Sequence, residues 1–238
     1  MSVSPTPMSI VASGLVKRFG QTTALNDVSL NLRTKQSTVM FGPNGAGKST
    51  FLRILATLTT PDRGTVQIAG YALHKNPALI RQYIGFLGHH TLLYEDLTVR
   101  ENLRFYGRLY RVPHLEDRIS KILRDVNASE SQDRKIRALS NGIQKRVGLA
   151  RALIHDPEIL LLDEPDAGLD QQAKDSLSKT LKLSVQRGVS VLLTSHDITW
   201  GLQLAHRTLV INKGRIIFEN DTNLANISTI TRLIEKEG

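Results

Sequence analysis

The spacing of apolar and polar residues predicts strands near the start of the chain, followed by a first helix. Ile10–Val16 is expected to form a strand, and Ala24–Leu32 alternates apolar with polar positions, as antiparallel strands do. Thr38–Phe41 is a short apolar run that predicts a buried strand. The apolar positions of Phe51–Ala56 have helical spacing. The opening quarter of the chain therefore predicts two strands, a buried third strand and a helix.

The rest of the chain divides into a helical middle and a second region of strands and helices. Further strands are expected at Thr65–Ala69, Ile84–Leu87, Ile159–Leu162, Val189–Thr194, Arg207–Asn212 and Arg215–Glu219, the last two as a hairpin. Helices are expected at Leu79–Tyr83, Val99–Tyr110, Glu116–Val126, Gly142–His155, Gln171–Arg187 and Thr199–Leu204. Because Ile159–Leu162 contains no polar position, we expect that strand to be buried on both faces of a parallel sheet.

This pattern predicts one α/β domain at residues 9–220, with its core at about 9–88 and 156–220. A helical subdomain at about 89–155 is inserted into that core. Residues 1–8 are expected to be a disordered leader, and residues 221–238 a weakly helical C-terminal tail. The turn at Lys17–Gly20 is expected to present the exposed aromatic Phe19.

Composition narrows the class of protein. The 238 residues contain no cysteine, which excludes disulfides and thiolate metal sites. No apolar stretch is long enough to cross a bilayer, and the N-terminus does not resemble a signal peptide. The net charge of +9 is spread along the chain without interleaved aromatic residues, which argues against nucleic-acid binding. We interpret it as an ordinary basic surface, with attraction to acidic lipids or a polar partner as the alternative.

A glycine-rich segment between the predicted buried strand and helix indicates nucleotide binding. It fits the pattern of Gly, four residues, then Gly-Lys-Ser/Thr, in which backbone N–H groups surround phosphates. The helix N-terminus adds partial positive charge. Lys48 can reach the terminal phosphates, and Ser49 can hold Mg²⁺. The residues expected to contact ATP are Gly42, Pro43, Asn44, Gly45, Ala46, Gly47, Lys48, Ser49 and Thr50.

Two later strands end on residues suited to hydrolysis. Asp163 and Glu164 follow the buried strand Ile159–Leu162. An aspartate there can hold Mg²⁺, and a glutamate beside it can act as general base toward water. His196 follows the next strand, and parallel strands gather ligands at their carboxyl ends. We therefore expect these three side chains to meet the phosphate loop.

Ser140, Asn141 and Gly142 stand just before a predicted amphipathic helix. A helix N-terminus bearing Ser and Gly is a second anion site. The simpler interpretation is a helix cap, which Ser or Asn favours in any case.

Taken in order, these motifs resemble those of an ABC-type ATPase over about residues 9–220. The segments that carry the resemblance are Gly42–Thr50, Ser140–Gly142 before a helix with Arg146, Leu160–Pro165, Ala167–Asp170 and Ser195–Asp197. The resemblance implies a P-loop NTPase fold of ABC type. Such a fold has a mostly parallel core sheet, an N-terminal antiparallel β subdomain and an inserted helical subdomain.

The resemblance also implies roles for single residues. Gly42–Thr50 resembles the Walker A loop, Asp163 the Walker B aspartate and Glu164 the catalytic glutamate. His196 resembles the switch histidine, and Phe19 the aromatic that stacks on adenine. ATP and Mg²⁺ are the implied cofactors.

Leu139–Ile143 resembles the family signature, which contacts ATP held by the opposite subunit and so implies a dimer. The signature usually reads Leu-Ser-Gly-Gly-Gln, whereas this chain has Asn141 and Ile143 at the third and fifth positions. Because Ser140 and Gly142 remain, we expect the anion site to persist, with Gln144 partly replacing the missing glutamine.

A second departure lies after Ile84–Leu87, where the family has a glutamine that reaches Mg²⁺ and water. Here that place is taken by His89, which we expect to face the nucleotide as a catalytic residue. Together with Leu97–Leu103, this run resembles the ATP-binding subunit of the cytochrome c maturation complex, of haem-exporter type. A nucleotide-facing place accounts for His89 better than a haem-ligand role would.

The expected function is therefore the ATP-hydrolysing motor of a membrane export complex, in haem-linked cytochrome c maturation. The alternatives are export of a drug, lipid or polysaccharide, or a weakly active ATP-binding clamp. An ABC ATPase acting on DNA or ribosomes is disfavoured, because the chain lacks a long coiled coil and a tandem cassette. The expected partners are membrane-spanning permease subunits, contacted through Thr91–Leu97, and a second copy of the chain. The expected location is peripheral, on the cytoplasmic face of the inner membrane.

Overall fold

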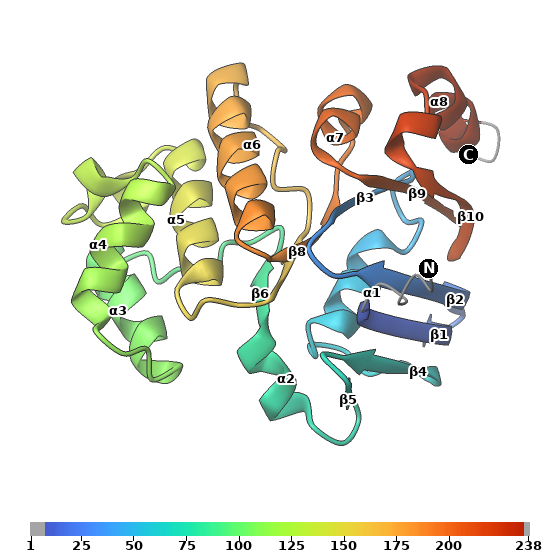
Figure 1. The fold of residues 1–238 in the computed structure, drawn as a ribbon, viewed down its shortest axis with the longest axis horizontal. Coiled ribbons are helices and arrows are strands. Elements are labelled where there is room, and N and C mark those ends of the chain that lie inside the picture. Colours follow the sequence, from blue (N-terminus) through green and yellow to red (C-terminus); the bar gives the residue numbers. More distant parts are fainter. Residues whose placement is uncertain (1–7, 236–238) are drawn as a thin grey trace, which may run out of the picture.

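The computed structural model describes residues 8–235 and folds into two sheets with helices around them (Figure 1). The leader predicted at 1–8 lies outside the described residues except for Met8, which begins strand β1 (Met8–Phe19). Residues 236–238 of the predicted tail also lie outside them.

The first sheet is antiparallel and has the order β2-β1-β4-β5. Its other strands are β2 (Thr22–Arg33), β4 (Arg63–Ile68) and β5 (Tyr71–Ala72). The turn predicted at Lys17–Gly20 is wrong in part. Cross-strand pairing continues to Phe19, which lies opposite Thr22, so that only Gly20 and Gln21 turn the chain. Gly20 has a φ of 57°, a conformation that glycine adopts without strain.

The second sheet has six strands in the order β10-β9-β3-β8-β7-β6. The strands are β3 (Ser37–Phe41), β6 (Ile84–Leu87), β7 (Ile159–Leu162), β8 (Ser190–Thr194), β9 (Arg207–Asn212) and β10 (Arg215–Asp221). All pairings are parallel except the hairpin of β9 and β10. Every residue of β3, β7 and β8 is buried, as expected for a parallel sheet covered on both faces.

The predicted helices are present, with ends shifted by a few residues. They are α1 (Lys48–Leu55), α2 (Pro77–Tyr83), α3 (Val99–Leu109), α4 (Leu115–Asp125), α5 (Asn141–Leu153), α6 (Gln171–Gln186) and α7 (Ile198–Leu204). Residues of the predicted tail form a further helix, α8 (Ile227–Glu235), whose Ile230 is fully buried. Helices α3, α4 and α5 lie together at one end of the molecule (Figure 1). The predicted ABC-type fold class is confirmed.

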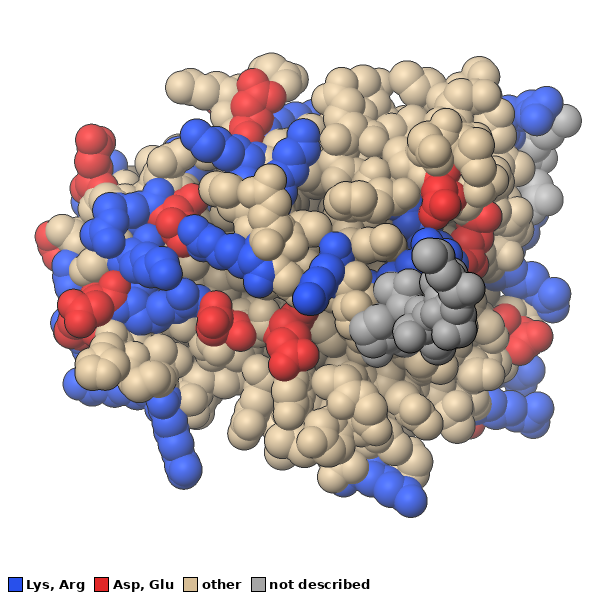
Figure 2. Space-filling model, viewed as in Figure 1, with Lys and Arg blue, Asp and Glu red and all other residues tan. Residues whose placement is uncertain are grey.

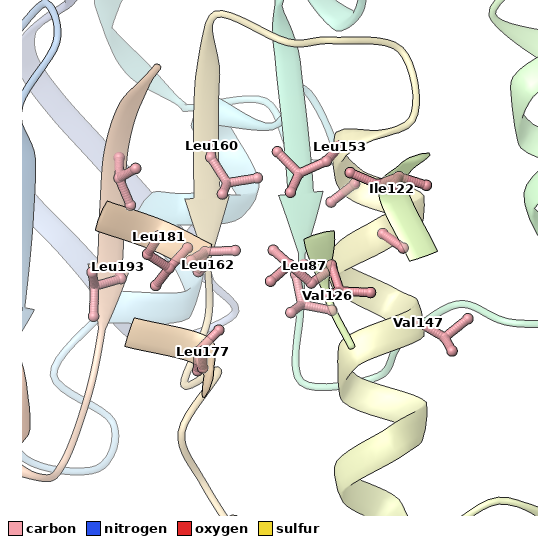
Figure 3. Packing of buried hydrophobic residues seen from close by; sticks show 14 of the residues in the cluster. Leu87, Ile122, Val126, Val147, Leu153, Leu160, Leu162, Leu177, Leu181 and Leu193 are labelled. Atoms are coloured by element: carbon pink, nitrogen blue, oxygen red, sulfur yellow. The ribbon is translucent and has the colours of Figure 1, made fainter. Parts of the chain in front are cut away.

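Alternate residues of the parallel strands supply two hydrophobic cores, one on each face of the six-stranded sheet, because successive side chains of a strand point to opposite faces. Leu160 and Leu162 pack toward α4, α5 and α6 (Figure 3). Leu161 and Leu192 belong to the other core, which includes α1 and the antiparallel sheet. The strand ends that carry the candidate site are thus held from both faces.

Strand β6 lies at the edge of this sheet, and α5 packs closely on it. A Cβ atom on Gly85 would lie 2.2 Å from the carbonyl oxygen of Ala152, so only glycine permits this approach. Arg151 donates a hydrogen bond to the carbonyl of Phe86 at 2.6 Å, and Nε2 of His155 lies 3.1 Å from the carbonyl of Ile84. Burial lowers the pKa of His155 to about 4. Its ring is therefore neutral at ordinary pH.

Figure 2 shows Lys and Arg side chains most densely on the side formed by α3, α4 and α5, with Asp and Glu side chains between them. The basic charge on this face is thus interspersed with acidic side chains. Among residues 8–235, no helix has both the length and the apolar character needed to cross a membrane.

Candidate functional site

The phosphate loop joins buried β3 to α1, as predicted. Gly47 precedes the helix with a φ of 107°, and a Cβ atom there would lie 2.4 Å from the carbonyl oxygen of Ala24. Glycine is therefore required for both backbone conformation and space. The first turn of α1 contains no acidic residue, so the partial positive charge of its N-terminus stays available to an anion.

Lys48 crosses the phosphate loop with its side chain buried. Its Nζ donates hydrogen bonds to the carbonyls of Gly42 at 2.7 Å and Pro43 at 3.0 Å, and it lies 4.0 Å from Oε1 of Glu164. Burial lowers the pKa of Lys48, while the carboxylates of Glu164 and Asp163 act in the opposite direction. The ammonium group thus lies between the loop and the two acids, as its predicted role requires.

Asp163 leaves the end of β7 with its carboxylate buried. Ser49 of the phosphate loop donates a hydrogen bond to its Oδ1 at 3.1 Å. Thr194, at the end of neighbouring β8, donates to the same oxygen at 2.9 Å. Ser49 and Asp163 are far apart along the chain, and the sequence predicts that they are adjacent in space. The structure brings them together.

Thr194 also accepts the backbone N–H of Glu164 at 2.9 Å. Glu164 has a φ of 51°, which is uncommon for a residue other than glycine, and this hydrogen bond helps to hold it there. Sequence reasoning missed Thr194. The available signal was a hydroxyl residue at the end of the otherwise apolar run of β8, next to the strand that ends on two acids.

His196 follows β8, and its Nε2 lies 2.7 Å from Oε1 of Glu164. The ring is about half exposed. The structure thus brings the two side chains together at the carboxyl ends of adjacent parallel strands. A carboxylate held by an imidazole beside a phosphate loop can accept a proton from water.

A magnesium ion fits the residues at this edge of the sheet. Within residues 8–235, no three His, Cys, Asp or Glu side chains gather into a metal site. Ser49 and Asp163 nevertheless offer two adjacent oxygen ligands. Mg²⁺ is commonly bound through one or two carboxylates together with substrate phosphates and water, so this sparse set suits it.

Ser140 and Asn141 lie exposed at the start of α5, on a different element from the phosphate loop. Ser140 occupies the N-cap position of α5, as the simpler interpretation expects, but its side chain makes no capping hydrogen bond. That Gln144 partly replaces the missing signature glutamine stays a prediction. The amide of Gln144 donates to the carbonyls of Ile136 and Leu139, both at 3.1 Å, and so lies against the segment just before the helix start.

Phe19 is exposed, with Nζ of Lys17 5.4 Å from its ring centroid, so one face of an aromatic ring is available at the end of β1. His89 is exposed as well, and its ring meets that of His90 edge-on at 5.3 Å between centroids. Within the described residues, the ring of His89 makes no hydrogen bond to Asp163 or Glu164. Its place at the nucleotide stays a prediction.

Comparisons with known proteins place this site in a family. Residues 25–167 match the family model described as ABC transporter. The chain is 36% identical over 217 residues to Nod factor export ATP-binding protein I of Ralstonia nicotianae, covering 90% of this chain and 67% of the relative. It is 35% identical over 224 residues to a daunorubicin/doxorubicin resistance ATP-binding protein of Streptomyces peucetius, covering 93% and 68%.

Among solved structures, the chain is similar to a dimeric ATP-binding cassette in a post-hydrolysis state bound to ADP and phosphate. The TM-score is 0.83 at 28% sequence identity, covering 90% of this chain and 98% of the other. The relatives are named for Nod factor export and drug resistance, and these names give no support to the expected haem export in cytochrome c maturation. The chain therefore belongs to the ABC transporter family, as an ATP-binding subunit that hydrolyses ATP.

Proposed function

We propose that this chain is the ATP-hydrolysing motor of an exporter for a drug, lipid or polysaccharide. The names of its relatives, which include linearmycin resistance in Bacillus subtilis, support export of this kind over haem export. The catalytic part of the proposal rests on one observation, that four side chains lie close together at the carboxyl ends of the parallel strands. They are Lys48, Asp163, Glu164 and His196.

In this proposal, the backbone N–H groups of Gly42–Thr50 bind the phosphates, and Lys48 neutralises their charge. Glu164 accepts a proton from the attacking water, and His196 orients its carboxylate through the 2.7 Å contact. Ser49 and Asp163 would hold Mg²⁺, which would neutralise phosphate charge. Phe19 stacks on adenine with its exposed ring.

We further propose a homodimer as the active unit. Ser140, Asn141 and Gly142 form an exposed helix N-terminus with an uncapped hydroxyl, which suits the phosphates of an ATP molecule held by a second copy. The similar cassette bound to ADP and phosphate is dimeric, which supports this arrangement.

We also propose that a membrane-spanning permease contacts Thr91–Leu97 and the helix that follows it. Thr91–Leu97 leads into α3, and both segments present large apolar side chains to solvent. We call Leu92, Tyr94, Phe105 and Leu109 the apolar patch; all four are exposed. Tyr94 and Phe105 contact each other edge-on at 5.1 Å. Contiguous exposed apolar side chains are typical of protein interfaces, so we assign the patch to the permease. The chain would then be peripheral, on the cytoplasmic face of the inner membrane.

The catalytic proposal is tested with Glu164→Gln. The amide cannot accept a proton, whereas Asp163 is unchanged, so ATP should bind while hydrolysis falls by about 100-fold or more. Size-exclusion chromatography with ATP and Mg²⁺ should show a trapped dimer. Glu158→Gln is the matched control, because Glu158 is exposed at the opposite end of β7. This variant should hydrolyse ATP like the parent. Undiminished hydrolysis in Glu164→Gln would remove Glu164 from its role.

The permease proposal is tested by purification from detergent extract. Phe105→Asp should lose the co-purifying membrane chain but keep the ATPase activity of the isolated subunit, because a charge in a buried apolar interface is costly. Leu183→Asp, at a comparably exposed apolar position on α6, should keep the membrane chain. Drugs, lipids and polysaccharides are then compared as stimulants of ATP hydrolysis by the recovered complex. Retention of the membrane chain by Phe105→Asp would contradict the assignment of the patch.

A further inference from the structure

Asp166 is a buried carboxylate that the proposed mechanism does not use. It lies in the loop between β7 and α6 and is only 5% exposed. Its Oδ2 accepts a hydrogen bond from Oγ of Ser195 at 2.8 Å, while its Oδ1 is buried without a partner among residues 8–235. A buried acid with an unsatisfied oxygen costs folding free energy. A role for Asp166 must offset this cost, and its hydrogen bond to Ser195 indicates what that role is.

That hydrogen bond reaches the residue directly before His196. Ser195 is 1% exposed, and its Oγ also accepts the backbone N–H of Asp197 at 2.9 Å. Both chain neighbours of His196 are thus tied to one hydroxyl group, which Asp166 orients. Asp197 is fixed further, since its carboxylate accepts from the backbone N–H of Trp200 at 2.9 Å and from Nζ of Lys174 at 2.6 Å.

The loop that carries Asp166 is itself anchored to α5. Nζ of Lys145 donates to the carbonyl of Ala167, and it lies 3.4 Å from the carbonyl of Glu164. Asp166 therefore sits on a fixed support, between the strand end bearing Glu164 and the strand end bearing His196. The two halves of the 2.7 Å contact between Glu164 and His196 are connected through this buried hydrogen bond.

We infer that Asp166 is a positioning residue for ATP hydrolysis, which sets the orientation of His196 through Ser195. The inference rests on the proposed role of His196. Without the carboxylate of Asp166, Oγ of Ser195 can turn to the carbonyl of Asp197, 3.4 Å away. His196 then loses its fixed place at Glu164, while the phosphate loop that binds ATP is untouched.

The test compares Asp166→Ala with Asp166→Asn in steady-state and single-turnover hydrolysis. Asp166→Ala should lower kcat about tenfold and leave KM for ATP within about twofold, because one hydrogen bond to a charged group is lost away from the phosphate loop. Asp166→Asn should keep most of the parent kcat, because its amide oxygen still accepts from Ser195. Thr180→Val is the matched control: it removes a buried hydroxyl on α6 that bonds only to the carbonyls of Asp125 and Ser176. Its kcat should equal that of the parent.

A second comparison, made in the His196→Ala variant, distinguishes a positioning role of Asp166 from a general structural role. In His196→Ala, adding Asp166→Ala should change the residual single-turnover rate by less than about twofold, because the group it positions is absent. Ser195→Ala removes the other partner of the hydrogen bond and should match Asp166→Ala, which keeps the test valid should Asp166→Ala fail to fold.

A parent-like kcat in Asp166→Ala together with an impaired His196→Ala would overturn this inference alone. A tenfold loss that persists in the His196→Ala background would overturn it as well. Parent-like hydrolysis by His196→Ala would instead overturn the proposed role of His196, and this inference with it.

Discussion

Replacing the buried Asn102 with leucine should weaken binding of the membrane partner without changing the catalytic site. Asn102 lies in α3 and is fully buried. Its Oδ1 accepts from the backbone N–H of Tyr94 at 2.8 Å, and its Nδ2 donates to the carbonyls of Tyr94 at 3.0 Å and Thr98 at 2.9 Å. One side chain therefore holds the segment that carries half of the apolar patch.

Leucine has the same branched shape and number of side-chain heavy atoms as asparagine, but it makes none of these three hydrogen bonds. At about 1 kcal/mol of net stabilisation each, their loss should lower the free energy of unfolding by about 3 kcal/mol. For a domain of this size, that corresponds to a fall in Tm of roughly 6–12 °C. The site of ATP hydrolysis lies on other elements, so the ATPase activity of the isolated Asn102→Leu subunit at low temperature should match that of the parent.

The assay pairs urea denaturation with purification of the membrane chain from detergent extract. Asn102→Leu should show a lower urea midpoint and reduced recovery of the partner, since Tyr94 is no longer held in place. Arg108→Ala changes an exposed side chain of the same helix and should unfold within about 0.5 kcal/mol of the parent. An unchanged urea midpoint in Asn102→Leu would refute the energetic reasoning, and full recovery of the partner would refute the link to the patch.

Three further predictions concern single ionisable residues. Lys48→Ala should lose affinity for ATP in calorimetric titration, because Lys48 is the ammonium group of the phosphate loop; parent-like affinity would contradict that role. His89→Gln should keep ATP affinity and measurable hydrolysis, because glutamine can make the same single contacts at that place. Abolished hydrolysis in this variant would contradict that expectation. Stability should fall as pH drops from 6.5 toward 4, because unfolded His155 binds a proton that the folded ring, with its pKa of about 4, does not. The loss should reach up to about 3 kcal/mol, and urea midpoints of His155→Phe should depend less on pH over this range.

Much of the fold could be predicted because its signals are local. Strands β6 and β7 were predicted with the bounds that the structure shows, since β7 is fully buried, β6 is mostly buried, and each leaves an uninterrupted apolar run. The phosphate loop was equally clear, because its glycines, lysine and hydroxyl stand in one short segment. Strand β5 was missed, because its two residues, Tyr71 and Ala72, are too few to show alternation.

The parts of the site that escaped prediction depend on contacts between distant segments. Thr194 reaches Asp163 only because β8 pairs in parallel with β7, a register that no local pattern specifies. The hydrogen bond between Asp166 and Ser195 depends on the same pairing. The expectation of haem export rested chiefly on one residue, His89, which is too little to identify a transported substrate.

The capped edge strand β6 also bears on how this subunit withstands aggregation. An uncovered sheet edge offers unpaired backbone groups to which a second molecule can add its own strand. At Ile84 and Phe86 those carbonyls are already occupied by His155 and Arg151, and the cationic guanidinium of Arg151 is costly to displace. Before its membrane partners are available, the subunit can therefore accumulate without this edge seeding intermolecular β-structure.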